Sequence, residues 1–128
     1  LESERRHYYD LFERAPVAYV ITSTEGTIRQ ANRLAAALLN TQTRHMIGRS
    51  LALFVPQGSR RAFRARMPHI CQNDSTHEWA THLQPWEGEP LDVLVLVAPT
   101  RDSTGRPVAL RWLLHGRIAA GQDAPDVP

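Results

Sequence analysis

The order of strand-like and helix-like segments constrains the fold of this chain more than any other feature. Two runs rich in β-branched residues come first and are joined by a turn that contains Gly26. A stretch with helical periodicity follows, and then three further strand-like runs separated by turn-forming residues. This order predicts an α+β fold with a five-stranded antiparallel sheet, in which the helices lie between the second and third strands. The five runs are residues 17–23, 27–31, 77–85, 90–100 and 106–115.

The helical stretch between the second and third strands begins and ends with recognisable signals. Asn32 is a good N-cap for a short, alanine-rich and leucine-rich helix over residues 33–40. Ser59 can cap a longer helix that runs from residue 60 to about residue 72, and the interior Pro68 should kink or shorten it. The segment between these helices is broken by glycine and proline and predicts one or two single-turn helices.

The length of 128 residues suits one domain with its own hydrophobic core. We expect an N-terminal flanking helix within residues 1–16, a core over residues 17–116 and a C-terminal linker over residues 117–128. No apolar run is long enough to span a membrane, the N-terminus is too charged for a signal peptide, and the single Cys71 excludes an intramolecular disulfide. These features predict a cytoplasmic domain, and the termini suggest that it was excised from a larger protein.

The charge of the chain is carried by an unusual set of residues. All fifteen basic residues are arginine, yet the net charge is only +2. A cluster at residues 60–66 raises the possibility of a nucleic-acid partner. Most of these arginines, however, fall on the polar side of a helix whose apolar side carries Phe63, Met67 and Ile70. We therefore interpret the cluster as a solvated face and expect neither a nucleic-acid partner nor membrane contact.

Short motifs follow one another in a particular order from about Tyr8 to His115. They are Phe12-Glu13-Arg14-Ala15-Pro16, residues 21–28 (ITSTEGTI), Ala31-Asn32, residues 47–51 (IGRSL), residues 53–56 (LFVP), Glu87-Gly88-Glu89-Pro90, and Pro99-Thr100-Arg101-Asp102 with Gly105. In this order the motifs make the chain resemble a PAS domain. The resemblance implies a sensory or interaction module, found mostly in bacterial signalling proteins, with a pocket between the helices and one face of the sheet.

The residues at the positions used by known PAS cofactors argue against most of them. Flavin-binding members use a cysteine where this chain has residues 42–45 (QTRH), and coumaryl-binding members use a cysteine where it has Gln57. Haem-binding relatives use a histidine on the long helix, and His69 is the candidate here. Strand parity places Trp112 in the volume that a porphyrin would need. We therefore expect no flavin and no haem, and either no cofactor or an unknown small molecule.

The sequence contains no convergent set of catalytic or metal-binding residues. His77 and His82 lie five apart on one predicted strand, which places them on opposite faces, so no metal site is predicted. Glu78 and Asp92 are predicted to point outward, and no serine or threonine lies in a nucleophile-elbow context. A small-pocket enzyme fold of the ketosteroid-isomerase type begins with helices, whereas here a hairpin precedes them. We expect a protein that is not an enzyme.

Sixteen residues are candidates to line the pocket between the helices and the sheet. For most of them plain core packing is the stronger interpretation. Thr22, Asn32 and Trp112 differ, because they would bring polar groups into an apolar cavity and could orient a small ligand. The candidates are Val20, Thr22, Ile28, Asn32, Leu39, Met46, Ile47, Leu51, Phe54, Phe63, Met67, Ile70, Val93, Val95, Val97 and Trp112.

The opposite side of the sheet is predicted to be apolar as well. If the alternate valines of residues 93–97 face the core, then Leu94, Leu96 and Leu113 face away from it, where a one-sided sheet should be polar. Such a patch needs a cover, either a second subunit or the N-terminal helix with Tyr8, Leu11 and Phe12.

Two functions remain open from the sequence. The first is a sensory PAS domain of a multidomain bacterial protein. Such a domain would bind a small apolar ligand in its pocket, or form homodimers and relay a signal to other domains, or do both. The alternative is a ligand-free dimerisation module. A kinase, cyclase, phosphatase or transcription factor would each suit as the effector.

Overall fold

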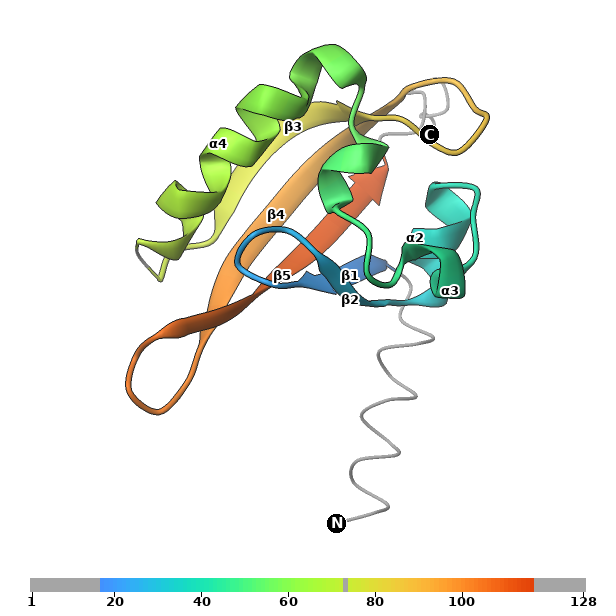
Figure 1. The fold of residues 1–128 in the computed structure, drawn as a ribbon. Coiled ribbons are helices and arrows are strands. Elements are labelled where there is room, and N and C mark those ends of the chain that lie inside the picture. Colours follow the sequence, from blue (N-terminus) through green and yellow to red (C-terminus); the bar gives the residue numbers. More distant parts are fainter. Residues whose placement is uncertain (1–16, 73, 117–128) are drawn as a thin grey trace, which may run out of the picture.

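The computed structural model describes residues 17–72 and 74–116 of the chain. They form one five-stranded antiparallel sheet in the order β2-β1-β5-β4-β3 (Figure 1). The predicted α+β topology is confirmed. The predicted flanking helix within residues 1–16 and the linker over residues 117–128 lie outside the described residues. The strands are β1 (Ala18–Thr22), β2 (Ile28–Ala31), β3 (His77–Leu83), β4 (Leu91–Arg101) and β5 (Pro107–Gly116).

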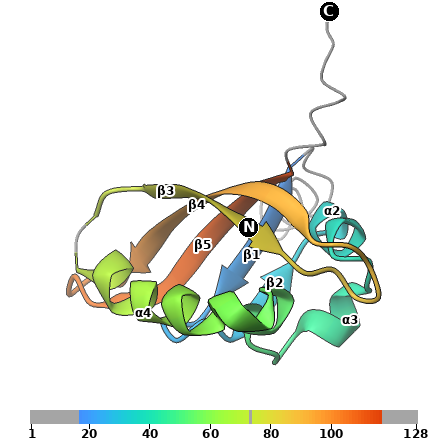
Figure 2. The ribbon, with the colours of Figure 1, turned by 90° about the horizontal axis from the view of Figure 1, so that it is seen from above.

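All the described helices lie between β2 and β3 in the sequence and on one side of the sheet, as Figure 2 shows. The longest helix, α4, lies against this side, and α2 and α3 lie beside β1 and β2. No helix among these residues is long and apolar enough to cross a membrane. The helices are α2 (Arg33–Leu38), α3 (Thr43–Met46), the 3-10 turns η1 (Leu51–Phe54) and η2 (Gln57–Ser59), and α4 (Arg60–Cys71).

Asn32 joins the first helix to the first strand. Its Oδ1 accepts hydrogen bonds from the backbone N–H of Ala35 and of Tyr19, each at 3.0 Å, and its Nδ2 donates to the Val17 carbonyl at 2.8 Å. The first of these bonds is the predicted N-cap. The other two fasten the start of α2 to β1, so a single buried side chain sets where the helical block begins on the sheet.

The helix α4 ends close to the predicted residue 72 but lacks the predicted cap. It is not shortened at Pro68 and continues to Cys71, and both Pro68 and Arg64, whose carbonyl loses its N–H partner, are exposed. Water can reach that side of the helix, so the missing bond costs least there. Ser59 makes no side-chain cap, because η2 runs directly into α4 and leaves Ser59 with a helical backbone (φ −105°, ψ −2°) instead of an extended one.

The alternation along the central strands matches the predicted strand parity. Val93, Val95 and Val97 are buried, and Val97 pairs with Trp112 on β5. The intervening Leu94 and Leu96 are only half-buried and point to the other side of the sheet. The core therefore lies between the helices and the sheet, and the far side of the sheet keeps an apolar surface.

Candidate functional site

The predicted pocket residues occupy the interior between α4 and the sheet. All of them are buried except Ile47, which is 44% exposed. Ile47 ends α3 with an extended backbone, and Met46 takes the inward position in its place. The structure therefore brings the predicted set together, apart from Ile47.

Three aromatic rings fill the centre of this interior. Trp112 is completely buried and stacks on Phe63, with ring centroids 5.5 Å apart and an interplanar angle of 24°. Trp79 approaches Trp112 edge-on at 6.3 Å, and the guanidinium carbon of Arg66 lies 4.2 Å from the Trp79 ring centroid. Such ring pairs and the cation over the indole stabilise the packing beyond simple burial.

The polar groups predicted to orient a ligand are engaged within the protein. The indole Nε1–H of Trp112 donates to Thr22 Oγ1 at 2.9 Å, and the Thr22 hydroxyl donates to the Ser23 carbonyl at 2.8 Å. Asn32 is engaged with the backbone, as described above. These three side chains therefore satisfy one another or the main chain, which is what buried polar groups require.

His69, His77 and His82 do not converge on the interior. His69 is exposed on α4, and His82 is exposed on β3 with its Nε2 2.7 Å from the Asp92 carboxylate. His77 is half-buried and points to the opposite face of β3 from His82. Within residues 17–72 and 74–116 no three His, Cys, Asp or Glu side chains form a group that could hold a metal ion.

Cys71, at the end of α4, is half-buried. Partial burial raises the pKa of its thiol, and the positive charge of Arg101 only partly opposes this. The thiol is therefore protonated at neutral pH and is a weak nucleophile.

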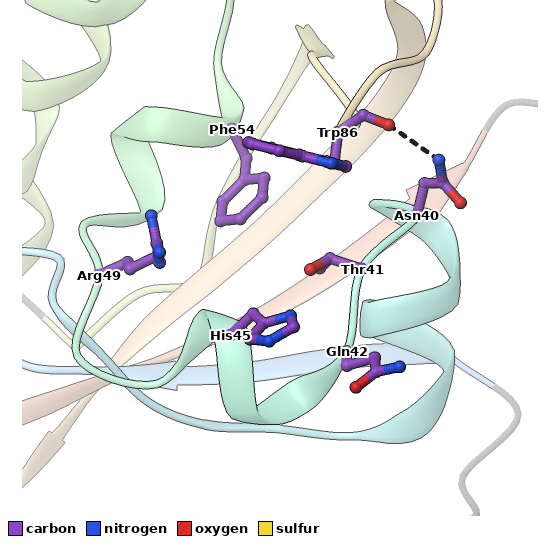
Figure 3. A pocket seen from close by; sticks show the side chains of 7 residues that line it. All are labelled: Asn40, Thr41, Gln42, His45, Arg49, Phe54 and Trp86. Atoms are coloured by element: carbon purple, nitrogen blue, oxygen red, sulfur yellow. Dashed lines mark hydrogen bonds between the residues drawn. The ribbon is translucent and has the colours of Figure 1, made fainter.

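A cavity of about 430 Å³ lies outside the aromatic interior, at the end of the domain where α2, α3, η1 and the β3–β4 loop meet (Figure 3). We call it the edge cavity. Of its residues only Phe54 was among the predicted pocket set. The single signal in the sequence that could have revealed it is Trp86, a large aromatic residue within a turn. The lining residues are Asn40, Thr41, Gln42, His45, Arg49, Phe54 and Trp86.

Hydrogen bonds hold the β3–β4 loop in place over this cavity. The Trp86 N–H donates to the Leu39 carbonyl at 2.9 Å, and Asn40 Nδ2 donates to the Trp86 carbonyl at 2.8 Å, as Figure 3 shows for the second bond. The Gln84 N–H donates to the Phe54 carbonyl at 2.6 Å. The loop is thus attached to both α2 and η1, and the walls of the cavity are joined to one another.

The side of the sheet turned away from the helices is the second candidate surface, and we call it the outer face. Leu94, Leu96 and Leu113 lie there half-buried, next to Tyr19 on β1. A shallow groove of about 210 Å³ runs over Leu96, Leu113 and Tyr19 and reaches Arg111. Tyr8, Leu11 and Phe12, which were predicted to cover this face, lie outside the described residues.

The sequence matches a family model described as PAS fold over residues 12–117. Because this match covers most of the chain, the chain belongs to the PAS family, and the resemblance inferred from its motifs is confirmed. No curated protein matches the sequence.

Solved structures share the fold at low sequence identity. The PAS domain of an HTR-like protein from Haloarcula marismortui has a TM-score of 0.78 and 17% identity, with 90% of this chain and 93% of that one covered. A domain of a sensory box sensor histidine kinase/response regulator from Geobacter sulfurreducens gives 0.71 and 14%, with 88% and 93% covered. The PAS domain of a LuxR-family transcriptional regulator from Burkholderia thailandensis, solved in complex with ethanol, gives 0.70 and 21%, with 85% and 96% covered.

Proposed function

We propose that this chain is a sensory PAS domain that pairs with a second copy of itself through the outer face and relays a signal to other domains of the protein that contains it. The observation that carries the proposal is the row of half-buried leucines on a sheet face that the described helices leave uncovered. A contiguous apolar surface of this kind marks an interaction site.

The charges that flank the leucines favour a second copy as the partner. Glu78 on β3 is exposed beside Leu96, and Arg111 on β5 is exposed beside the same leucine row on its other side. If two copies pack face to face about a twofold axis parallel to the strands, Arg111 of each copy lies toward Glu78 of the other. An interface that carries opposite charges on its two sides is self-complementary in this way.

The filled interior supports a relay that needs no ligand there. Trp112, Phe63 and Trp79 occupy the space that a ligand between α4 and the sheet would need. Binding of a small apolar ligand in this interior would require these rings to move. We therefore favour the ligand-free interior of the two alternatives. The absence of enzymatic activity and a cytoplasmic location stay predictions.

The dimer is tested by changing Leu96 to Glu, which places a charge in the centre of the outer face, where burial of an ionised group is strongly disfavoured. Sedimentation velocity of the full chain should then report a monomer where the unchanged chain is a dimer. Leu53→Glu is the matched control, because Leu53 is 42% exposed on η1, on the helical side of the domain, and this change should leave the dimer intact.

Exchanging the charges of Glu78 and Arg111 tests the predicted contact between the two copies directly. Arg111→Glu alone should weaken the dimer, and Glu78→Arg together with Arg111→Glu should restore it. A chain that sediments as a monomer before any substitution would contradict the proposal. Circular dichroism of each variant would confirm that the fold is retained. If Leu96→Glu instead makes the first 16 residues sensitive to protease in a monomeric chain, the cover of the outer face is intramolecular.

A further inference from the structure

The edge cavity is lined by polar and aromatic side chains, most of which contribute neither to the aromatic interior nor to the outer face. Figure 3 shows its labelled side chains arranged around a common space, with the rings of Phe54 and Trp86 at one end. The polar groups of Thr41, His45 and Arg49 lie around the rest of this space. A cavity of about 430 Å³ that combines two aromatic rings with several polar side chains has the size of a small-molecule site.

Trp86 is exposed in a way that packing does not explain. Its side chain is 60% exposed, the largest exposed fraction among the large hydrophobic residues described, although its backbone is held on both sides by Leu39 and Asn40. These hydrogen bonds therefore hold the backbone from which the ring extends at the mouth of the cavity. An exposed indole offers a flat surface for stacking against another ring.

The backbone around the cavity adopts an uncommon conformation. Within residues 17–72 and 74–116, the non-glycine residues with positive φ are Asn40, at 55°, and Glu87, at 53°. Asn40 lines the cavity and Glu87 directly follows Trp86. Asparagine tolerates this region of φ, whereas glutamate does not favour it. Such conformations concentrate at sites where a loop must hold a particular shape.

The charge at the cavity is positive and uncompensated. Arg49 lines the cavity, and within the described part of the chain its guanidinium makes no hydrogen bond or ion pair. His45 lines the cavity beside it, and no carboxylate side chain is among the lining residues. A guanidinium with free donors beside an apolar wall matches a carboxylate, because it can donate two parallel hydrogen bonds to the two oxygens.

We propose that the edge cavity binds a small aromatic carboxylate, with its carboxylate on Arg49 and its ring against Trp86 and Phe54. The hydroxyl of Thr41 points into the space between Arg49 and the rings and supplies a further donor (Figure 3). The site lies outside the aromatic interior, so occupancy requires no displacement of Trp112. This inference goes beyond the proposed dimer, because the residues that it uses lie on the helical side of the domain and not on the outer face.

Benzoate is the probe for this site, with benzamide and acetate as controls that lack the charge and the ring, respectively. Titration of the ¹⁵N-labelled full chain should shift the indole N–H signal of Trp86, assigned with Trp86→Phe, in a saturable manner. The indole signals of Trp79 and Trp112 should move little. Benzamide and acetate should bind at least about tenfold more weakly than benzoate, because each lacks one of the two contacts.

Two variants separate binding at this cavity from nonspecific association. Arg49→Gln should weaken benzoate about tenfold or more while its effect on benzamide is small, since benzamide has no carboxylate for the guanidinium to bind. Arg64→Gln is the matched control, because Arg64 is exposed on α4 away from the cavity, and it should bind benzoate as the unchanged chain does. Trp86→Ala should weaken benzoate without changing the thermal unfolding midpoint greatly.

Either of two results would overturn the proposal. One is a Trp86 indole signal that does not saturate with benzoate. The other is an equal affinity of the unchanged chain and Arg49→Gln. Sedimentation of Arg49→Gln should match that of the unchanged chain, so failure at the cavity is distinguishable from failure of the dimer.

Discussion

The contact between Thr22 and Trp112 offers the most direct test of the interior. Both side chains are completely buried, and the indole N–H has the Thr22 hydroxyl as its acceptor. Thr22→Val keeps the β-branched shape that suits β1 and replaces the hydroxyl with a methyl group. The Ser23 carbonyl, which loses the Thr22 hydroxyl, still accepts from the Gly26 N–H at 3.0 Å. The loss therefore falls mainly on the indole N–H.

A buried donor left without an acceptor costs about 1 to 3 kcal/mol, so Thr22→Val should lower the free energy of unfolding by that amount. The cost should depend on the indole. In a Trp112→Phe background the N–H is already gone, and Thr22→Val should then cost about 1 kcal/mol less than in the unchanged chain. Trp112→Phe alone is destabilising, because the smaller ring leaves part of the space beside Phe63 empty.

Urea unfolding followed by circular dichroism measures these differences from the midpoint and slope of each transition. Thr24→Val is the matched control, because the Thr24 hydroxyl contacts only the exposed Glu25 carboxylate, and its effect should stay within about 0.5 kcal/mol. A Thr22→Val change as mild as the control, or one equally costly in both backgrounds, would refute the packing of Trp112 against Thr22.

Three further substitutions test how the elements are joined. Asn32→Ala removes the N-cap hydrogen bond to Ala35 and the two hydrogen bonds to the backbone of Tyr19 and Val17, and it should cost about 2 kcal/mol or more in urea unfolding. Gly26→Ala places a Cβ at a φ of +96° and should cost about 1 kcal/mol or more in the same measurement. The hydroxyl of Thr104, followed by the N–H groups of Arg106 and Thr104, lowers the pKa of Asp102, which an NMR titration of its carboxyl carbon should show. The hydrogen bonds of this turn therefore stabilise the fold above the unfolded pKa of the carboxyl, about 4, and this stabilisation is lost as the pH falls through the lower folded pKa. The difference in unfolding free energy between the unchanged chain and Asp102→Asn should shrink over this pH range.

Much of the fold could be predicted because strand alternation, helix capping and turn residues in the sequence all indicate the same arrangement of elements. The alternation of valine and leucine along residues 93–97 predicts which face is buried, and the register that pairs Val97 with Trp112 confirms it. Asn32 is a capping residue by its chemistry, and Gly26 suits the positive φ that the hairpin turn has. Each of these signals depends on residues close together in the chain.

The edge cavity could not be predicted, because its walls meet only through contacts distant in the sequence. Trp86 and Asn40 are 46 positions apart, and a backbone hydrogen bond to Leu39 brings their loops together. The roles of Thr22 and Trp112 were obscured for the same reason, since 90 positions separate the two groups that satisfy each other. A polar residue in an apolar run indicates a buried partner, but periodicity does not say whether that partner is a ligand or another side chain.

The arrangement of the molecule lets the two proposals be separated in one set of samples. The outer face around Leu96 and the edge cavity around Arg49 are separate surfaces that share no lining residue. If the sites are independent, Leu96→Glu should abolish the dimer and keep benzoate binding, and Arg49→Gln should do the reverse. If benzoate instead strengthens the dimer, the strengthening factor must equal the factor by which dimerisation tightens benzoate binding, since coupling between two sites is reciprocal. Measuring both factors would then establish whether the edge cavity acts as the input of the relay.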